Sequence, residues 1–321
     1  MHIPDGFLDA KTLAVTTGLA AVGVTAAVRQ ARTQLPPKKV PLLGVTAAFV
    51  FAAQMVNFPI AGGTSGHLIG GVLAGVLLGP SGAVLVMTAV LTLQCLLFAD
   101  GGLLALGANI FNMGMVGGVG GYYVYRAVRR AFGAQSSFFA VPVAAWCGTV
   151  MAAVATAGEL SLSGVVPWSV GVLAMAGVHM VMGVGEALIT TLVVLAIDRT
   201  RPEILADGSA GLPFRGTGET VVFGLMISLG LGMFISPIAS TWPDGLEKVA
   251  AALGFLGRAV KMPLIPAPIP DYALPGIASP AWATAVAGGI GTTVVFLVVL
   301  AIARLVVPRR RGDAGPASSS G

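Results

Sequence analysis

Charged residues are scarce in this sequence. Asp, Glu, Lys and Arg make up 10% of its 321 residues, whereas a soluble domain of ordinary composition carries about 25%. Hydrophobic residues make up 56% of the chain. This composition excludes an ordinary soluble domain and predicts an integral membrane protein.

Cysteine is nearly absent, and two common catalytic motifs do not occur. Cys95 and Cys147 are the two cysteines, and both fall in apolar stretches, which excludes a disulfide framework and favours a packing role. No Gly-Lys dipeptide occurs, so the chain has no P-loop for ATP hydrolysis. No His-Glu-x-x-His motif occurs, which counts against an intramembrane zinc protease. The net charge of +5 does not indicate nucleic-acid binding, because the positions of the basic residues matter more than their sum.

The hydropathy pattern predicts an all-α integral membrane protein with nine spans. A helix needs about 20 apolar residues to cross a bilayer, and every predicted span is near this length except the short third one. The predicted spans are 12–29, 40–56, 67–79, 82–98, 103–125, 138–157, 168–197, 220–240 and 282–307.

The basic residues predict the orientation of these spans. With the N-terminus outside and the C-terminus inside, all but four of the 18 Lys and Arg residues fall in inner segments. The four exceptions are Lys11, Lys248, Arg258 and Lys261. This distribution follows the positive-inside rule, and it places four segments on one outer face: 1–11, 57–66, 99–102 and 241–281.

Three histidines are present, and two of them are predicted to share the outer face. The Met1 amine and the His2 amide nitrogen can close a five-membered ring on a metal ion. The same amide nitrogen and the imidazole Nδ1 of His2 can close a six-membered ring, so three nitrogens lie in one plane. His67 would complete a square, a geometry that favours Ni(II) or Cu(II) over Zn(II). The alternative is a frayed His2 and a His67 that makes ordinary hydrogen bonds at a helix end.

Several long motifs resemble one family of membrane transporters. The stretches "MHIPDGFL", "SGHLIGGVLAGVLLGP", "FADGGLLALGANIFNMG" and "GVGEALIT" resemble the CbiM/NikM family, the substrate-capture subunits of energy-coupling-factor (ECF) importers for cobalt and nickel. The later "PDGLEKVA" and "APIPDYALPG" resemble the small CbiN/NikN accessory subunit, or PDGLE region. The resemblance runs from the first residue to about residue 307.

The resemblance implies a domain organisation. Residues 1–200 would form a seven-helix, metal-binding bundle and residues 220–308 a two-helix, PDGLE-like unit. Residues 201–219 would form a cytoplasmic linker, and the tail 309–321 is predicted to be disordered, given its composition.

The resemblance also implies a site and partners. Met1, His2 and His67 would hold the transported Ni(II) or Co(II), with no bound organic cofactor and no enzymatic activity. The partners would be a transmembrane coupling subunit (CbiQ/NikQ-like) and cytoplasmic ATPases (CbiO/NikO-like), in the cell membrane. The square-planar argument favours Ni(II), and low-spin Co(II) also accepts a planar site.

Other polar residues are candidates for roles around the site. Asp5 and Asp244 each lie in a Pro-Asp-Gly turn and are candidate caps for the helices that follow. The alternative is that both turns line the outer entrance, and the resemblance favours the 241–281 loop reaching the metal site. His179 and Glu186 are seven residues apart, which places them on one face of a helix inside the membrane. Five outer polar residues are expected to hydrogen-bond the imidazoles: Gln54, Asn57, Thr64, Ser65 and Asn109.

Two other functions are compatible with parts of the sequence. A rhomboid-like serine protease would use Ser65, in the Gly-Thr-Ser-Gly stretch 63–66, with His179 as a dyad. This reading leaves His2 unexplained, and the rhomboid Trp-Arg loop is missing. A proton-coupled secondary transporter would use His179 and Glu186, and it would work without ATPases.

Overall fold

The computed structural model describes residues 1–133, 136–205, 217–260 and 264–307. Within these ranges the regular secondary structure is helical apart from one antiparallel hairpin of β1 (Phe58–Ile60) and β2 (Thr64–Gly66). The prediction of an all-α protein is therefore correct except for this hairpin, which lies in a segment predicted to be an outer loop. Six segments of the described chain are long and apolar enough to cross a membrane: α1 (Ala10–Gln34), α3 (Gly71–Phe98), α6 (Ser137–Leu162), α7 (Trp168–Thr200), Gly218–Ile238 and α10 (Pro280–Val306).

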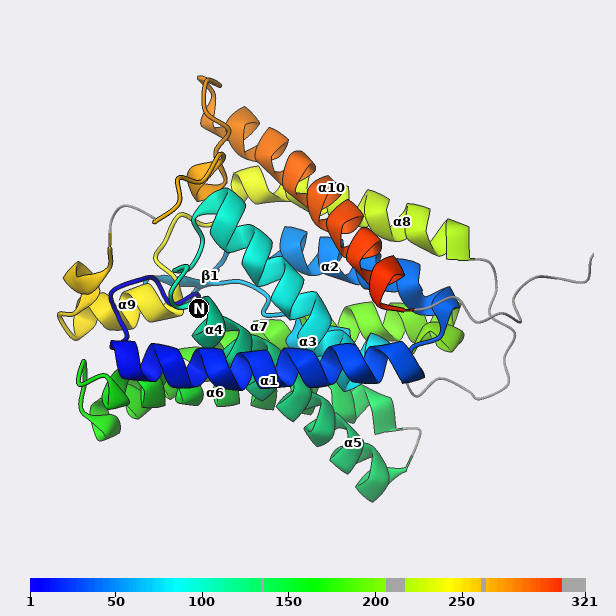
Figure 1. The fold of residues 1–321 in the computed structure, drawn as a ribbon, viewed down its shortest axis with the longest axis horizontal. Coiled ribbons are helices and arrows are strands. Elements are labelled where there is room, and N and C mark those ends of the chain that lie inside the picture. The colour runs from blue at the N-terminus through cyan, green and yellow to red at the C-terminus, as the bar shows by residue number, and fades with distance from the viewer. Residues whose placement is uncertain (134–135, 206–216, 261–263, 308–321) are drawn as a thin grey trace, which may run out of the picture.

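The helices form a bundle that encloses the N-terminus. Figure 1 shows α1 lying across the bundle beside α6 and α3, with α10 and α8 (Thr217–Gly230) on the opposite side near α2 (Val40–Gln54). Gly44 of α2 and Gly291 of α10 lie where a Cβ atom would touch Phe296 and Phe51 of the facing helix. Such small residues allow membrane helices to approach closely.

The α3 segment folds back on itself at Gly79 and Pro80. Gly79 has φ 79° and ψ 176°, which is not helical. A straight helix of this length would be about 42 Å long, yet His67 and Asp100, which flank it, both contact His2. The bend therefore returns the chain to the end of the bundle at which His2 and His67 lie. It coincides with the predicted break between residues 79 and 82.

Two other predicted spans are irregular helices. The span predicted at 103–125 consists of α4 (Leu106–Asn109), a π-helical segment η2 (Ile110–Val119) and α5 (Gly120–Phe132). The span predicted at 220–240 consists of α8, a π-helical turn η5 (Leu231–Ile235) and a 3-10 turn η6 (Ser236–Ile238). The segment 241–281, predicted to lie on the outer face, contains α9 (Gly245–Ala252) and the 3-10 turns η7 (Leu256–Arg258) and η8 (Pro270–Tyr272) in its described part. Two more 3-10 turns, η1 (Pro37–Lys39) and η4 (Pro202–Ile204), precede α2 and follow α7.

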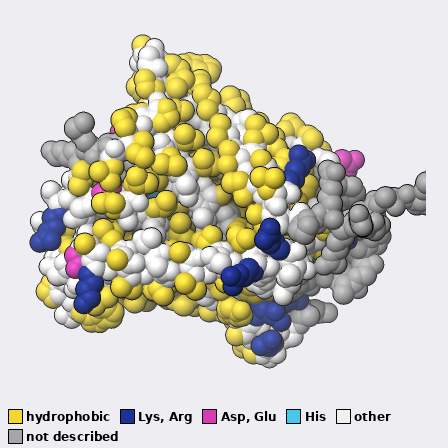
Figure 2. Space-filling view, viewed as in Figure 1, with side chains coloured by type: hydrophobic (Ala, Val, Ile, Leu, Met, Phe, Trp, Pro, Cys, Tyr) yellow, Lys and Arg dark blue, Asp and Glu magenta, His cyan; other side chains and the backbone are white. Residues whose placement is uncertain are grey.

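The surface of the bundle is apolar. Figure 2 shows hydrophobic side chains over much of one face, with Lys and Arg in separate groups. Val22 is 70% exposed and Leu173 is 75% exposed, as expected for side chains that face lipid. The nine-span count and the orientation remain predictions. The tail prediction (309–321) and most of the linker prediction (206–216) lie outside the described residues.

The bend at Gly79 leads to a test of stability. Replacing Gly79 by Ala adds a methyl group that meets no described atom within 4 Å, but the backbone conformation there is essentially restricted to glycine. We expect G79A to lower the free energy of unfolding by about 1–3 kcal/mol. The matched control is G177A, at a helical glycine whose added methyl is equally unopposed, and it should be neutral or stabilising. Thermal unfolding in detergent measures both, and equal melting temperatures for the two variants would contradict the expectation.

Candidate metal centre

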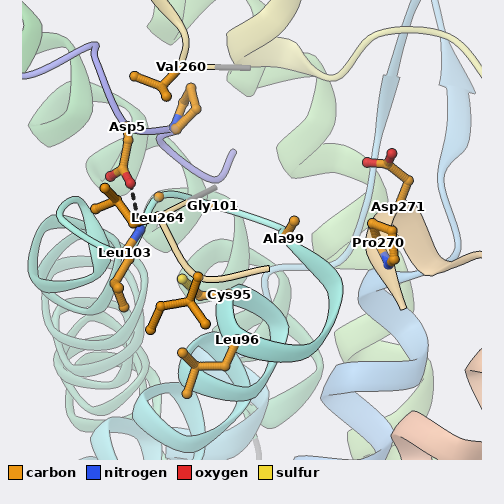
Figure 3. Close-up of a pocket in the computed structure, with 13 residues that line it drawn as sticks. Asp5, Cys95, Leu96, Ala99, Gly101, Leu103, Val260, Leu264, Pro270 and Asp271 are labelled. Atoms are coloured by element: carbon orange, nitrogen blue, oxygen red, sulfur yellow. Dashed lines mark hydrogen bonds between the residues drawn. The ribbon is translucent and has the colours of Figure 1, made fainter. Parts of the chain in front are cut away.

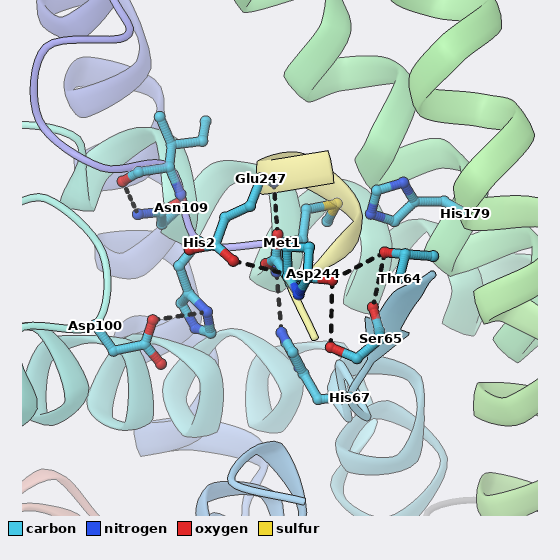
Figure 4. A network of polar contacts seen from close by, with 12 residues as sticks. Met1, His2, Thr64, Ser65, His67, Asp100, Asn109, His179, Asp244 and Glu247 are labelled. Carbon is cyan, nitrogen blue, oxygen red and sulfur yellow. Dashed lines mark hydrogen bonds and ion pairs between the residues drawn. The ribbon is translucent and has the colours of Figure 1, made fainter. Parts of the chain in front are cut away.

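The first residues of the chain are buried inside the bundle. Met1 is 1% exposed and Ile3 is fully buried. The Ile3 N–H donates to Asn109 Oδ1 at 2.8 Å, and Asn109 Nδ2 donates to the Ile3 carbonyl at 3.1 Å. The Gly102 N–H also donates to the Ile3 carbonyl, at 2.9 Å. Asn109 therefore acts as a two-point clamp on the main chain of the N-terminal segment (Figure 4).

Asp5 anchors the same segment from its other end. Its carboxylate accepts hydrogen bonds from the backbone N–H groups of Leu103, Leu104 and Ala105, at 2.9–3.1 Å. Figure 3 shows the bond to Leu103. These N–H groups precede α4, so Asp5 satisfies amides at the start of a distant helix. The expectation that Asp5 caps the helix after it is wrong, because Asp9 accepts from Thr12 N at 2.8 Å and caps α1. A cavity of about 200 Å³ lies beside Asp5.

The amine of Met1 contacts the imidazole of His67. The Met1 nitrogen lies 2.9 Å from His67 Nε2. His67 Nδ1 lies 3.0 Å from the Leu68 carbonyl, which can only accept, so Nδ1 carries the proton. The Nε2 lone pair therefore faces the amine. These two nitrogens are thus free to serve as metal donors once the amine loses its proton.

His2 lies against His67. Their ring centroids are 5.3 Å apart, and the rings are stacked with an interplanar angle of 23°. His2 Nδ1 lies 3.2 Å from Asp100 Oδ1, and His2 Nε2 is buried without a hydrogen-bond partner in the described part of the chain. The structure thus brings together the three predicted donor residues. The predicted chelate uses Nδ1 of His2, so its contact with Asp100 must be exchanged for the metal.

Asp244 brings the C-terminal region to the amine. Its Oδ2 atom accepts from the Met1 amine at 2.7 Å. Its Oδ1 atom accepts from Glu247 N at 2.8 Å, and Glu247 Oε2 accepts from Asp244 N at 3.1 Å. This capping box confirms Asp244 as the N-cap of α9. The resemblance favours the 241–281 loop reaching the metal site, and this contact agrees with that expectation. The amine itself is not predicted as the partner of Asp244.

The electrostatic environment keeps the imidazoles neutral. Burial, followed by the Met1 ammonium, lowers the pKa of His67 to about 3. Burial also lowers the pKa of His2, although the Asp100 carboxylate opposes this. Burial alone would raise the pKa of Asp244, but the ammonium and the Glu247 amide lower it well below its ordinary value. The site therefore presents neutral imidazoles and an ionised carboxylate.

A cavity of about 640 Å³ opens above these residues. His2 and His67 line it from the N-terminal part of the chain, and Asp244 and Tyr272 line it from the C-terminal part. Its lining also includes Asp100, Glu247 and Asp271, and it contains no Lys or Arg among the described residues. Such a cavity favours a cation.

The five outer polar residues hold loops rather than imidazoles. Ser65 Oγ donates to the Trp242 carbonyl at 2.7 Å, and Thr64 Oγ1 donates to the Pro243 carbonyl at 3.0 Å. Gln54 Nε2 donates to the Ile69 carbonyl at 2.7 Å. The Asn57 carbonyl accepts from Ser240 N at 2.8 Å, and Asn109 clamps Ile3 as described above. The expectation of direct hydrogen bonds to the imidazoles is therefore not met at any of the five in the described contacts.

His179 and Glu186 do not form a pair. Glu186 accepts hydrogen bonds from Ile69 N at 2.6 Å and Gly70 N at 2.9 Å, so it supports the main chain just after His67. His179 Nδ1 donates to the Met175 carbonyl at 2.8 Å, and its ring lies beneath Gly245 at the start of α9. Ser65 and His179 each bond to a main-chain carbonyl and not to each other, so they do not form a catalytic dyad.

Two residues near the site, Asp100 and Tyr272, are not among the site residues predicted from the sequence. Asp100 touches His2, and the Tyr272 hydroxyl donates to Asp100. Asp100 follows directly after a predicted span, on the outer face that the histidines share, and this position was the available signal. Tyr272 lies in the Pro-rich segment 241–281, which is predicted to share this face, but nothing in the sequence pairs it with Asp100, 172 residues away.

The buried neutral His67 leads to a test of stability against pH. In the unfolded chain this imidazole gains a proton near its ordinary pKa of about 6.5, but in the folded protein it does so only near 3. The unfolded state therefore binds more protons between these values, and stability falls as the pH is lowered from 7 towards 4. We expect metal-free wild type to lose about 2 kcal/mol more than H67Q between pH 7 and pH 5. Denaturant titration in detergent measures this, and parallel curves for the two proteins would contradict it.

Comparison with known proteins assigns both parts of the chain. The model of the cobalt uptake substrate-specific transmembrane region (CbiM) matches residues 2–204, and the model of the PDGLE domain matches residues 218–308. A protein of Archaeoglobus fulgidus named as a fused nickel transport protein, NikMN, is 37% identical and covers 95% of this chain and 98% of its own. The fused nickel transport protein NikMN of Rhodobacter capsulatus is 32% identical, over 85% of this chain and 88% of its own.

The comparison extends to cobalt transport proteins and to a crystal structure. The cobalt transport protein CbiM of Geobacter sulfurreducens is 32% identical, over 83% of this chain and 81% of its own. The crystal structure of a truncated transition metal transporter superposes with a TM-score of 0.57 at 36% identity, covering 62% of this chain and 99% of that one. The chain is thus a multi-pass membrane transport protein and not an enzyme, and it belongs to the CbiM family, with a fused PDGLE domain at its C-terminal end.

Proposed function

We propose that this chain captures Ni(II) or Co(II) at the outer face of the cell membrane and delivers it inward. The donors are the Met1 amine, the His2 amide nitrogen and imidazole, and His67 Nε2. The observation that carries the proposal is the 2.9 Å separation of the Met1 nitrogen and His67 Nε2. Two adjacent donors in a square with metal–nitrogen bonds of about 2.0 Å lie about 2.8 Å apart, so these atoms already have the spacing of neighbouring ligands.

The order of the donor atoms in the two chelate rings agrees with the short distance between the amine and His67 Nε2. The amide nitrogen lies between the amine and the imidazole in the two fused rings, so the fourth ligand sits opposite the amide and next to the amine. His67 occupies such a position beside the amine. A planar set of four nitrogens favours Ni(II), and geometry selects among divalent ions more than affinity does.

The chemistry of loading is an exchange of protons for metal. The Met1 ammonium and the His2 amide each lose one proton, so two protons leave as one divalent ion enters. Asp244, which contacts the ammonium at 2.7 Å, then faces the metal centre. Asp244 and Asp100 supply negative charge next to the site, which offsets the charge of the ion at the membrane boundary.

We propose that the rest of the transport cycle needs partners. Residues 1–200 would form the capture unit and residues 220–308 the unit that closes over it. The chain has no P-loop, and uphill uptake of a scarce ion needs an energy source. A transmembrane coupling subunit (CbiQ/NikQ-like) and cytoplasmic ATPases (CbiO/NikO-like) fit this need, as in an ECF importer.

Extension of the N-terminus tests the proposed donors. One residue added before Met1 moves the free amine by about 3.8 Å, so we expect Ni(II) and Co(II) affinity to fall by about 100-fold or more. The control carries the same residue at the C-terminus and should bind normally. Metal analysis of the purified proteins, with ligand-field absorption spectra, measures both. Normal binding by the N-terminally extended protein would rule out the amine as a donor.

Uptake assays separate the proposal from the two alternatives. We expect metal uptake by cells to require the ATPase partners. We expect S65A to retain uptake, because the Ser65 hydroxyl donates to the loop carbonyls of Trp242 and Pro243. Radiometal uptake with and without the ATPases measures this. Uptake that persists without ATPases and collapses with a proton uncoupler and in E186Q would support a secondary transporter instead.

A further inference from the structure

Tyr272 is connected to His2 through Asp100. The Tyr272 hydroxyl donates to Asp100 Oδ2, and Asp100 Oδ1 lies 3.2 Å from His2 Nδ1. One carboxylate thus has one oxygen for the phenol and the other for the imidazole. The phenol comes from the C-terminal region and the imidazole from the second residue of the chain.

The phenol is held rigidly by aromatic packing. The Tyr272 ring stacks on Phe98 at a centroid distance of 4.7 Å and an angle of 17°. Phe51 lies 5.2 Å from Phe98 and 6.1 Å from Tyr272, measured between ring centroids, and both phenylalanines are fully buried. The Ile269 N–H donates to the Leu97 carbonyl at 2.9 Å, which ties the loop to the end of α3. The position of the hydroxyl is therefore fixed by packing as well as by its hydrogen bond.

Backbone strain is concentrated on the two sides of the hydrogen bond between Tyr272 and Asp100. Three non-glycine residues in the described part of the chain have positive φ: Ala99 at 57°, Asp271 at 53° and Tyr272 at 56°. Ala99 precedes Asp100, and the other two carry the phenol. Such conformations are unfavourable for these residues and persist only where the surroundings impose them, which is common at functional sites.

We propose that Tyr272 is a positioning residue for the metal site, which holds Asp100 so that Asp100 orients the imidazole of His2. The inference rests on the proposed function, because it deepens the role of His2 as a ligand. The Asp100 side chain is 27% exposed and that of His2 is 7% exposed, so without the phenol the carboxylate is free to turn into the cavity. A carboxylate that hydrogen-bonds a ligand imidazole fixes its ring orientation and raises its basicity.

The Asp100 carboxylate can hydrogen-bond the His2 imidazole both without and with the bound metal ion. In the structure Asp100 faces Nδ1, while Nε2 of His2 has no partner among the described residues. When Nδ1 binds the metal, the ring proton moves from Nδ1 to Nε2, and a turn of the ring brings the Nε2–H group to the carboxylate. Burial and the Asp100 carboxylate raise the pKa of Tyr272 well above its ordinary value. The phenol therefore stays protonated and remains a donor in both forms.

Single and double substitutions in the full chain test this role. Y272F removes the hydroxyl and keeps the aromatic stack, and D100N removes the charge that orients His2. We expect D100N to weaken Ni(II) binding about 10- to 100-fold and Y272F about 3- to 10-fold, with a shifted ligand-field band. The double variant should match D100N, because Tyr272 acts only through Asp100. The control is Y123F, since Tyr123 is 60% exposed and lines neither of the two cavities at the site.

Affinity is measured by competition with a chelator, and folding by the melting temperature in detergent. If Y272F binds Ni(II) as tightly as Y123F does, the positioning role is wrong while the proposed function stands. Additive losses in the double variant would also overturn it, because they show an independent effect of Tyr272. Absence of Ni(II) and Co(II) binding by wild type would overturn both the proposed function and this inference.

Discussion

The contact of the Met1 amine with His67 and Asp244 is the interaction on which the site depends. A buried ammonium must be paired, and here it has a carboxylate at 2.7 Å and an imidazole at 2.9 Å. These partners come from distant parts of the chain, so the amine can be placed only if the whole bundle is formed. The supports of the N-terminal segment serve this placement: Asn109 clamps Ile3, and Asp5 takes three amides before α4.

The bend in α3 explains how both flanks of one helical segment reach His2. His67 precedes the segment and Asp100 follows it, and the reversal at Gly79 and Pro80 returns the chain to its starting level. Glu186 holds the two amides after His67, so the position of this imidazole is set by a carboxylate on a different helix. Glu186 is a buried ionisable side chain, and its hydrogen bonds to these two amides give it a structural role.

Local information in the sequence predicts the elements, while the contacts between them need the structure. The span predicted at 282–307 is α10, Pro280–Val306, because a long apolar run determines a helix by itself. The meeting of Met1, His2 and His67 could also be predicted, because it follows from adjacent residues and a shared face. The roles of Ser65 and Thr64 could not, because their acceptors are carbonyls more than 170 residues away. The pairing of Asp100 with Tyr272 depends on tertiary packing in the same way.

The C-terminal region contributes a charged group, Asp244, to the site in addition to lying over it. Asp244 has two oxygens, and both are used: one on the amine and one on the first turn of α9. If the Met1 amine moves, the Asp244 carboxylate cannot move with it without breaking the capping box of α9. Since Gly245 rests directly on the His179 ring, α9 is also restrained by α7 from below. A divalent ion bound by the deprotonated amine would thus meet a carboxylate whose position is set by two helices, which is the preorganisation that a selective site requires.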